Sequence, residues 1–495
     1  MPINSSYAKL KMTQHYYSAI VITAIPTFVI ATCIAYATGL PYLFYPSLVA
    51  LMLVFLLAMV SDAKVAWPVY YVVLSSIYFW VGYSTWIFGF STDKYVETGR
   101  IFVGIIQYLP FIAMLAYFFL YKKTTRRIKD LYLIWFLFVG YIVLKNISNS
   151  SALETAIQIR NFVGPLTYFM IGIYVSYVSG AVATKIIYRY IYLFAVIIAC
   201  FGVLEYLWGQ NFWLEYFPAQ FVSDLKMAGA GDGGIIGNKL IGINHVVYYR
   251  LSSIFYTPPH AAYNLVFFAL FFYVYFRSKY IKLSSQSRSV ISSLHIICFS
   301  ILVFLTLIKA GWGVYVIALL VYFVISRNMS GRAVSISFIK ILLLFFLGVF
   351  GAIVGVWLYT ASGVVSTGRA HIAAFMYVFG LPFGKLIFGG HDPNFYILNS
   401  DSGFATIVLS IGVVGYSVFF LSICLMIKRI LENKNHNKIS LMLVSLIVGW
   451  FMALHLTSSA WSPMGAFILF FSAGFFSGPR AMDIMVNQPR SVQTA

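Results

Sequence analysis

The sequence predicts an all-α integral membrane protein, and its composition carries that prediction. Hydrophobic residues make up 61% of the 495-residue chain and charged residues only 9%, against roughly 25% charged in an ordinary soluble protein. The mean hydropathy is +0.88. So few charges cannot cover a water-exposed surface, and lipid must therefore be the solvent for most of the chain. These values exclude a soluble enzyme, a nucleic-acid-binding domain and a disordered scaffold.

The apolar residues gather in segments of about the length that a helix needs to cross the hydrocarbon core, roughly 20 residues at 1.5 Å rise. About fourteen transmembrane helices are expected, and residues 1–495 form one polytopic membrane domain. The predicted spans are 17–37, 42–60, 67–90, 101–120, 131–147, 162–179, 186–207, 260–276, 289–308, 311–326, 338–358, 402–427, 440–457 and 461–478.

The distribution of Lys and Arg predicts the orientation of these spans. With the N-terminus in the cytoplasm, about two thirds of the basic residues fall in cytoplasmic loops, as positively charged loops should. The net charge of +20 is thereby explained by topology, and both termini face the cytoplasm. Two long loops, 208–259 and 359–401, then lie outside the membrane, and polar residues of these loops are the main candidates for chemistry.

No cofactor or metal motif is expected. Gly229, Gly231 and Gly234 match GxGxxG, but a dinucleotide site needs a strand before the glycines and a helix after them. Here the run lies in an outward loop between spans, so a tightly turned loop is the better interpretation. The sequence has no HExxH, no GK[ST] and no paired Cys/His cluster, and it predicts neither a metal site nor a phosphate-binding loop.

Four cations stand at outward membrane edges, against the orientation rule. They are Arg160 before the sixth span, Arg250 at the end of the first long loop, Lys309 in a tight turn and Arg369 in the second long loop. Any one of them alone would most simply snorkel to the interface. Together they are what a membrane-embedded diphosphate needs, because guanidinium groups bind phosphate oxygens bidentately.

Acidic and histidine candidates accompany these cations. Asp401 stands directly before the twelfth span, where a helix N-cap is the simpler role. His260 begins the eighth span and His391 lies late in the second long loop; either could be a general base or only a hydrogen-bonding residue. Glu205, at the outward end of span seven, could contact a sugar or belong to an aromatic belt with its neighbours.

The order of these motifs resembles a known family. RxxSxFxxP occupies 250–258, a hairpin turns at Lys309, STGR lies at 366–369, and SDSGF…GVVG covers 400–415. This pattern looks like the bacterial O-antigen polymerase (Wzy) family, within the O-antigen polymerase and ligase superfamily of lipid-dependent glycosyltransferases. IRNFVGPLTYFMIG at 159–172 is similar to the arginine-containing stretch of the polymerases. The resemblance covers about residues 150–420.

The resemblance implies a GT-C-like fold in the bacterial inner membrane, with its active face in the periplasm. Its substrates would be undecaprenyl-diphosphate-linked oligosaccharides, both donor and acceptor, without cofactor, metal or nucleic acid. A polysaccharide chain-length regulator and membrane lipid are the other partners that it implies. The implied site residues are Arg250, Arg369, Arg160 and Lys309 on the diphosphate, Asp401 as base or acceptor-orienting group, and Tyr256, His260, His391 and Glu205 around the sugars.

Several alternatives stay open. Ligases carry an outward histidine where this chain has Asp401, which favours the polymerase over the ligase. Ser253 stands where the family often has glycine, and Lys309 where the ligases have arginine. A protein O-oligosaccharyltransferase shares the same motifs. A polysaccharide flippase belongs to another class, but the sequence has neither mid-span charges nor a pair of broken helices in two similar halves.

Overall fold

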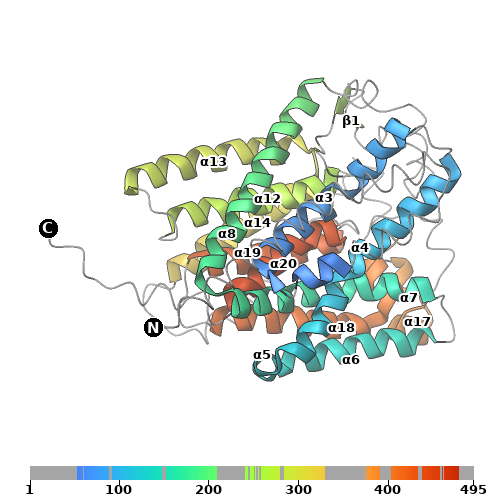
Figure 1. Cartoon of the computed structure of the whole chain (residues 1–495). Helices are drawn as coiled ribbons and strands as arrows, with labels where there is room; N and C mark the ends of the chain where they lie inside the picture. The colour runs from blue at the N-terminus through green and yellow to red at the C-terminus, as the bar shows by residue number, and fades with distance from the viewer. Residues whose placement is uncertain are drawn as a thin grey trace, which may run out of the picture.

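The computed structural model is a bundle of long helices with one short sheet (Figure 1). It describes residues 53–59, 61–88, 92–147, 152–208, 240–243, 246–249, 251, 253, 255, 258–278, 284–328, 374, 376–390, 403–432, 438–456, 460 and 462–478. Within these ranges, seven helices are long and apolar enough to cross a membrane. The chain is therefore a mainly helical protein of membrane-spanning character.

The helices follow the apolar runs of the sequence closely. Because lipid offers no hydrogen bonds, a spanning segment must satisfy its backbone internally, and a helix does so. The helices are α3 (Ala63–Phe88), α4 (Thr92–Leu120), α5 (Lys122–Arg127), α6 (Lys129–Asn146), α7 (Ala152–Gln158), the π-helical turn η2 (Ile159–Val163), α8 (Gly164–Trp208), α12 (Pro258–Arg277), α13 (Ser285–Leu305), α14 (Lys309–Asn328), α17 (Phe383–Phe388), α18 (Gly403–Glu432), α19 (Lys438–Leu456) and α20 (Pro463–Ser477).

Local signals fix several helix ends. The hydroxyl of Ser284 accepts a hydrogen bond from the Ser287 amide at 3.1 Å and caps α13, and Ser462 caps α20 ahead of Pro463. Serine before a helix and proline in its first turn are both favoured there. The chain changes direction sharply within α8, which supplies two membrane-length segments, Ala152–Ser179 (with α7 and η2) and Thr184–Trp208 (Figure 1).

The centre of the bundle is the packing of α8 against α20. A β-carbon on Gly474 would overlap the carbonyl of Phe169, and one on Gly172 would overlap the carbonyl of Phe471. Small residues let membrane helices approach this closely. Every residue of α20 from Pro463 to Phe476 is buried, so α20 is surrounded by other helices rather than by lipid.

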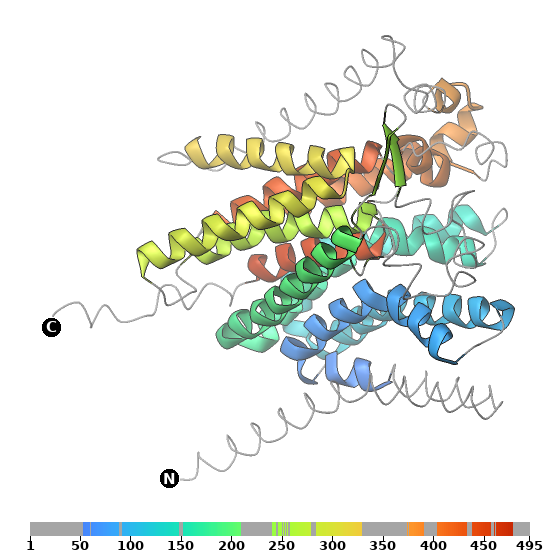
Figure 2. The same cartoon turned by 90° about the horizontal axis from the view of Figure 1, so that it is seen from above.

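A buried amide ties three helices together beside this pair. Asn264 of α12 accepts a hydrogen bond from the Tyr71 hydroxyl of α3 at 2.6 Å and donates one to the Met464 carbonyl of α20 at 2.8 Å. Polar side chains hold membrane helices together in this way because lipid offers no competing partner. Figure 2 shows α3 and α4 along one side of the bundle and α13 and α14 toward the other.

A short hairpin accompanies the helices. Strands β1 (Leu240–Ile243) and β2 (Val246–Tyr249) pair antiparallel, with Leu240 opposite Tyr249. They lie in the predicted loop 208–259, between the end of α8 and the start of α12. In Figure 1, β1, α7 and α17 lie toward one end of the bundle and α5 toward the other. We call these two ends the α7 end and the α5 end.

Candidate functional site

Arg160 lies in an unusual turn of helix at the α7 end. The turn Ile159–Val163 is π-helical and joins α7 to α8 without interrupting the helix. A π-helical turn holds an extra residue, and such turns occur frequently at functional sites. The backbone thus marks the same position that the sequence singles out by its charge.

The side chain of Arg160 is half-buried and bound to amides. Its Nη1 donates to Gln107 Oε1 of α4 at 2.5 Å, and its Nε donates to Asn161 Oδ1 at 3.0 Å. These bonds fix the guanidinium between α4 and η2. An arginine that merely snorkels to the interface would extend toward water instead. The contacts therefore indicate a positioned cation.

A second cation, Lys145 of α6, lies near this turn. Its Nζ donates to the carbonyl oxygen of Ser410 and, at 3.3 Å, to Gln158 Oε1. Asn146 donates to the same Gln158 oxygen at 2.9 Å. Gln158 directly precedes the π-helical turn, so both cations lie at the α7 end, with Arg160 bound to α4 and Lys145 beside Gln158.

Lys145 binds at a break in helix α18. Gly412 has φ +66° and ψ 178°, which no helix contains, so the carbonyls just before it lose their helical partners. Lys145 takes the carbonyl of Ser410, and the Tyr141 hydroxyl donates to the carbonyl of Ile411 at 2.7 Å. The amide of Gly390 donates to Leu409 O at 2.8 Å. Two side chains and one loop amide thus provide hydrogen bonds to the three carbonyls that precede the break.

The described partners of both cations are uncharged. Within the part of the chain that the structure describes, Arg160 and Lys145 donate hydrogen bonds to amide and carbonyl oxygens, and no carboxylate pairs with either cation. Two half-buried cations with neutral partners favour a nearby anion, since little of their charge is compensated by the protein. The site is therefore suited to a phosphate-bearing ligand.

Glu205 is buried inside the bundle and hydrogen-bonded to the backbone. Its side chain is fully buried, and its Oε2 accepts a hydrogen bond from the Ser253 amide at 2.5 Å. The Ser253 hydroxyl donates to the Ile198 carbonyl at 2.7 Å, and its φ is +53°. Glu205 therefore holds the turn at Ser253 against α8. Ser253 follows Arg250 by three residues in the sequence.

The remaining described candidates lie at helix starts. Lys309 is the first residue of α14 and is exposed. His260 lies in the first turn of α12, where its carbonyl accepts from Asn264 at 2.8 Å. Lys309 follows the end of α13 by four residues, as the predicted tight turn requires. The structure shows neither residue in contact with Arg160.

Five predicted site residues lie outside the described residues: Arg250, Tyr256, Arg369, His391 and Asp401. Within the described ranges, no group of three or more His, Cys, Asp or Glu side chains could hold a metal ion.

Two polar contacts at this end of the bundle escaped the sequence-based prediction. Lys145 is one of them, because its partner is distant in sequence. The other is His455 of α19, whose Nδ1 donates to the Phe451 carbonyl at 2.7 Å, so its Nε2 accepts from the Tyr416 hydroxyl at 2.8 Å. The ring of His455 stacks on Phe404, three residues after Asp401. A histidine within an apolar span has no local sequence signal that would single it out.

Comparison with known proteins adds no family to this description. No protein family model, no curated protein sequence and no solved structure matches the chain.

Proposed function

We propose that the protein polymerises a surface polysaccharide from lipid-linked repeat units, as an O-antigen polymerase does. The observation that carries the proposal is the pair of cations Arg160 and Lys145 at the α7 end, both held on neutral partners. The resemblance of residues 150–420 to the polymerases supports the same function.

The proposed topology has fourteen spans in the bacterial inner membrane, with both termini in the cytoplasm and loops 208–259 and 359–401 in the periplasm. The α7 end would then face the periplasm. It holds the cations that would meet the diphosphate of the lipid carrier, and a chain-length regulator would bind alongside.

The reaction moves a glycan from one carrier to another. A hydroxyl oxygen of the acceptor sugar attacks the anomeric carbon of the donor glycan and forms the new glycosidic bond. The bond from that carbon to the phosphate oxygen breaks, and undecaprenyl diphosphate leaves with the electron pair. Asp401 accepts the hydroxyl proton. Arg160, Arg250 and Arg369, with Lys309 in support, stabilise the charge that develops on the diphosphate.

Each described residue has a distinct part in this proposal. Arg160 is fixed by Gln107 before substrate arrives, so its charge needs no reorganisation during the reaction. Glu205 and Ser253 hold the segment that begins at Arg250. Lys145 stabilises the broken helix that follows the Asp401 segment, and its charge adds to that of Arg160.

Purified protein and purified lipid-linked repeat unit provide the direct test. We expect wild-type protein in detergent to produce glycan chains of several repeat units on the lipid. Arg250→Ala and Arg369→Ala should each nearly abolish the product while the protein remains inserted and expressed. In cells, deletion of a polymerase leaves lipopolysaccharide core with one repeat unit, whereas deletion of a ligase leaves bare core.

One observation favours a second function, transport of the lipid-linked glycan. Transporters bind substrates at broken helices, and α18 is broken at Gly412. A flippase would move the repeat unit across vesicle membranes and would form no glycosidic bond. Polymer formation by the purified protein therefore separates the two functions.

A further inference from the structure

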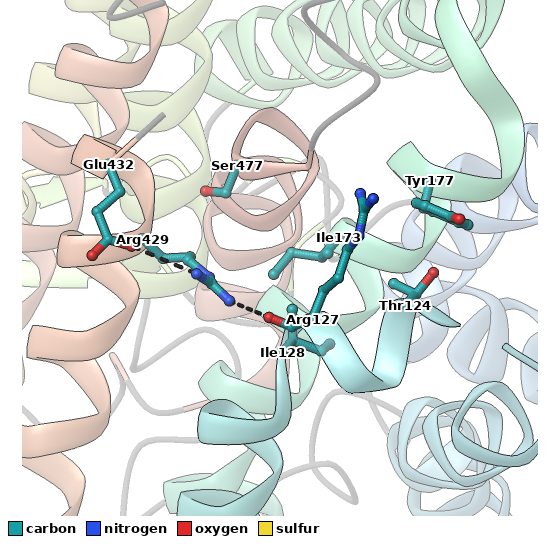
Figure 3. A pocket seen from close by; sticks show the side chains of 8 residues that line it. All are labelled: Thr124, Arg127, Ile128, Ile173, Tyr177, Arg429, Glu432 and Ser477. Atoms are coloured by element: carbon teal, nitrogen blue, oxygen red, sulfur yellow. Dashed lines mark hydrogen bonds and ion pairs between the residues drawn. The ribbon is translucent and has the colours of Figure 1, made fainter. Parts of the chain in front are cut away.

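The α5 end of the bundle holds a cavity that the proposed reaction does not use. It has a volume of about 380 Å³ and lies between α5, the first half of α8, α18 and α20 (Figure 3). Tyr177, on its wall, follows Arg160 by 17 residues along one helix, which is about 25 Å at 1.5 Å per residue. The cavity is therefore separate from the candidate site at the α7 end.

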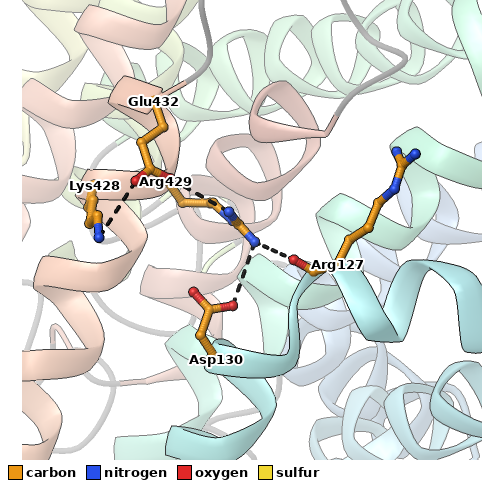
Figure 4. Close-up of polar contacts among 5 residues, drawn as sticks. All are labelled: Arg127, Asp130, Lys428, Arg429 and Glu432. Carbon is orange, nitrogen blue, oxygen red and sulfur yellow. Dashed lines mark hydrogen bonds and ion pairs between the residues drawn. The ribbon is translucent and has the colours of Figure 1, made fainter.

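The carboxylates at this cavity are already paired. Arg429 lies 3.5 Å from both Asp130 and Glu432 and donates to the Arg127 carbonyl at 2.5 Å, and Lys428 lies 3.6 Å from Glu432 (Figure 4). These contacts tie the end of α18 to the junction of α5 and α6. They also compensate the charges of the two carboxylates, Asp130 and Glu432.

The guanidinium of Arg127 stays outside this network. Figure 4 shows its side chain directed away from Asp130 and Glu432. The guanidinium carbon lies 5.9 Å from the centroid of the Tyr177 ring. Among the described residues it has no carboxylate within ion-pair distance. Arg127 is therefore a cation at the mouth of a cavity with its donors available.

Two further features of the wall suit a lipid head group. Thr124 is buried, with 1% of its surface exposed, and its hydroxyl has no hydrogen-bond partner in the described structure. An unpaired buried hydroxyl is unfavourable unless a ligand or water satisfies it. Ile128 and Ile173 supply an apolar side, which a glycerol backbone could contact.

We propose that this cavity binds the phosphate head group of an anionic membrane phospholipid. Arginine binds phosphate oxygens bidentately, and basic pockets between membrane helices are suited to such head groups. Lys122 and Lys123 of α5 would draw anionic lipid toward this end. The helix C-termini of α18 and α20, which carry partial negative charge, disfavour an anion, so the proposal depends on Arg127.

The test uses the full chain in an uncharged detergent. Binding of phosphatidylglycerol, phosphatidylcholine and inorganic phosphate is measured by the shift of the thermal unfolding midpoint with ligand concentration. We expect phosphatidylglycerol to stabilise the wild type and the other two probes to do so far less. Arg127→Gln should weaken phosphatidylglycerol binding about tenfold or more, the loss expected for one charge-assisted contact.

Arg126→Gln is the matched control, since Arg126 is an exposed neighbour on the same helix that does not line the cavity. It should bind phosphatidylglycerol as the wild type does. Equal weakening by both substitutions would overturn the proposal in favour of general surface charge. Protection by inorganic phosphate as strong as that by phosphatidylglycerol would overturn the lipid assignment.

A second pair of variants serves if Arg127→Gln does not fold. Arg127→Lys keeps the charge and loses the bidentate geometry, so we expect weaker binding than in the wild type. Thr124→Val should leave the lipid-free protein at least as stable, because it removes an unpaired hydroxyl, and should also weaken binding. Unchanged binding by both variants would overturn the proposal.

Discussion

Gly389 and Gly412 pack directly against each other: a β-carbon on Gly389 would lie 2.7 Å from the Gly412 amide nitrogen. Both residues have positive φ, +73° and +66°. The end of α17 thus docks on the backbone of α18 at its break, and neither position has room for a side chain. This contact joins the second predicted loop to the span that follows it.

Replacement of Gly412 by alanine should therefore destabilise the protein strongly. The backbone conformation alone costs about 1–3 kcal/mol for a residue with a side chain, and the new methyl group would overlap the Ile387 carbonyl. Gly140→Ala is the control, because a β-carbon there meets no heavy atom within 4 Å. Thermal unfolding of both purified variants measures the difference, and equal midpoints would contradict the contact.

Arg160→Gln should reduce polymer formation about tenfold or more, since one charged contact to the diphosphate is lost. Arg160→Lys should recover only part of the activity, because lysine lacks the bidentate fork. Arg189→Gln, an exposed arginine on the same long helix, should leave activity unchanged. The assay is polymer length from purified lipid-linked repeat unit at matched protein level. Normal polymer from Arg160→Gln would assign Arg160 a structural role.

Ser253 offers a test of the turn before α12. Ser253→Ala loses the hydrogen bond to Ile198 and should destabilise the protein by about 1 kcal/mol. Ser253→Gly loses the same bond but relieves the positive φ, a gain of roughly 1–2 kcal/mol, so glycine should be at least as stable as alanine. Chemical or thermal unfolding ranks the variants. If the Ser253→Ala variant is more stable than the Ser253→Gly variant, the turn does not adopt the left-handed conformation.

Asp401→Asn separates a helix cap from a catalytic base. Asparagine caps a helix about as well as aspartate, so a structural role predicts normal abundance and near-normal polymer. A general base should lose about 100- to 10,000-fold in rate, since an amide cannot accept the proton. The rate of polymer formation from purified substrate distinguishes the two roles. Activity within a few-fold of the wild type would remove Asp401 from the mechanism and make His260, His391 and His455 the next candidates.

Reporter fusions test the orientation. A fusion after residue 230 or 390 should report a periplasmic position, and one after residue 283 or 434 a cytoplasmic position, because the basic residues favour the cytoplasmic loops. Alkaline phosphatase, which is active only outside the cytoplasm, and a cytoplasmic fluorescent reporter give opposite signals. A cytoplasmic signal from either long loop would contradict both the topology and the reaction.

The helices could be predicted from sequence because hydropathy is a local property. The predicted span 260–276 is α12, Pro258–Arg277, and 440–457 is α19, Lys438–Leu456. The break in α18 could not be predicted in this way. Its glycine lies in IGVVG, an apolar run like many others, and glycine is common in membrane helices.

The site needed contacts between distant segments. Arg160 and Glu205 could be identified from the sequence as charges at the ends of spans. Their partners could not, because Gln107 lies 53 residues from Arg160 and Ser253 lies 48 residues from Glu205. Lys145 binds a carbonyl 265 residues further along the chain. No periodicity or motif specifies such pairs, so the sequence could nominate cations but could not separate a positioned cation from a snorkelling one.

The π-helical turn at Ile159–Val163 also sets the rotational phase of the long helix that contains it. In an α-helix each residue advances the direction of the side chains by about 100°, so one extra residue turns every later position by nearly that amount relative to α7. Gln158 can therefore face α6 while Phe169, beyond the turn, faces α20. Deletion of a single residue from this turn would leave the helix intact. It would rotate Arg160 away from Gln107, or Gly172 of α8 away from α20. The extra residue of the π-helical turn thus determines both the direction of the Arg160 side chain and the packing of α8 against α20.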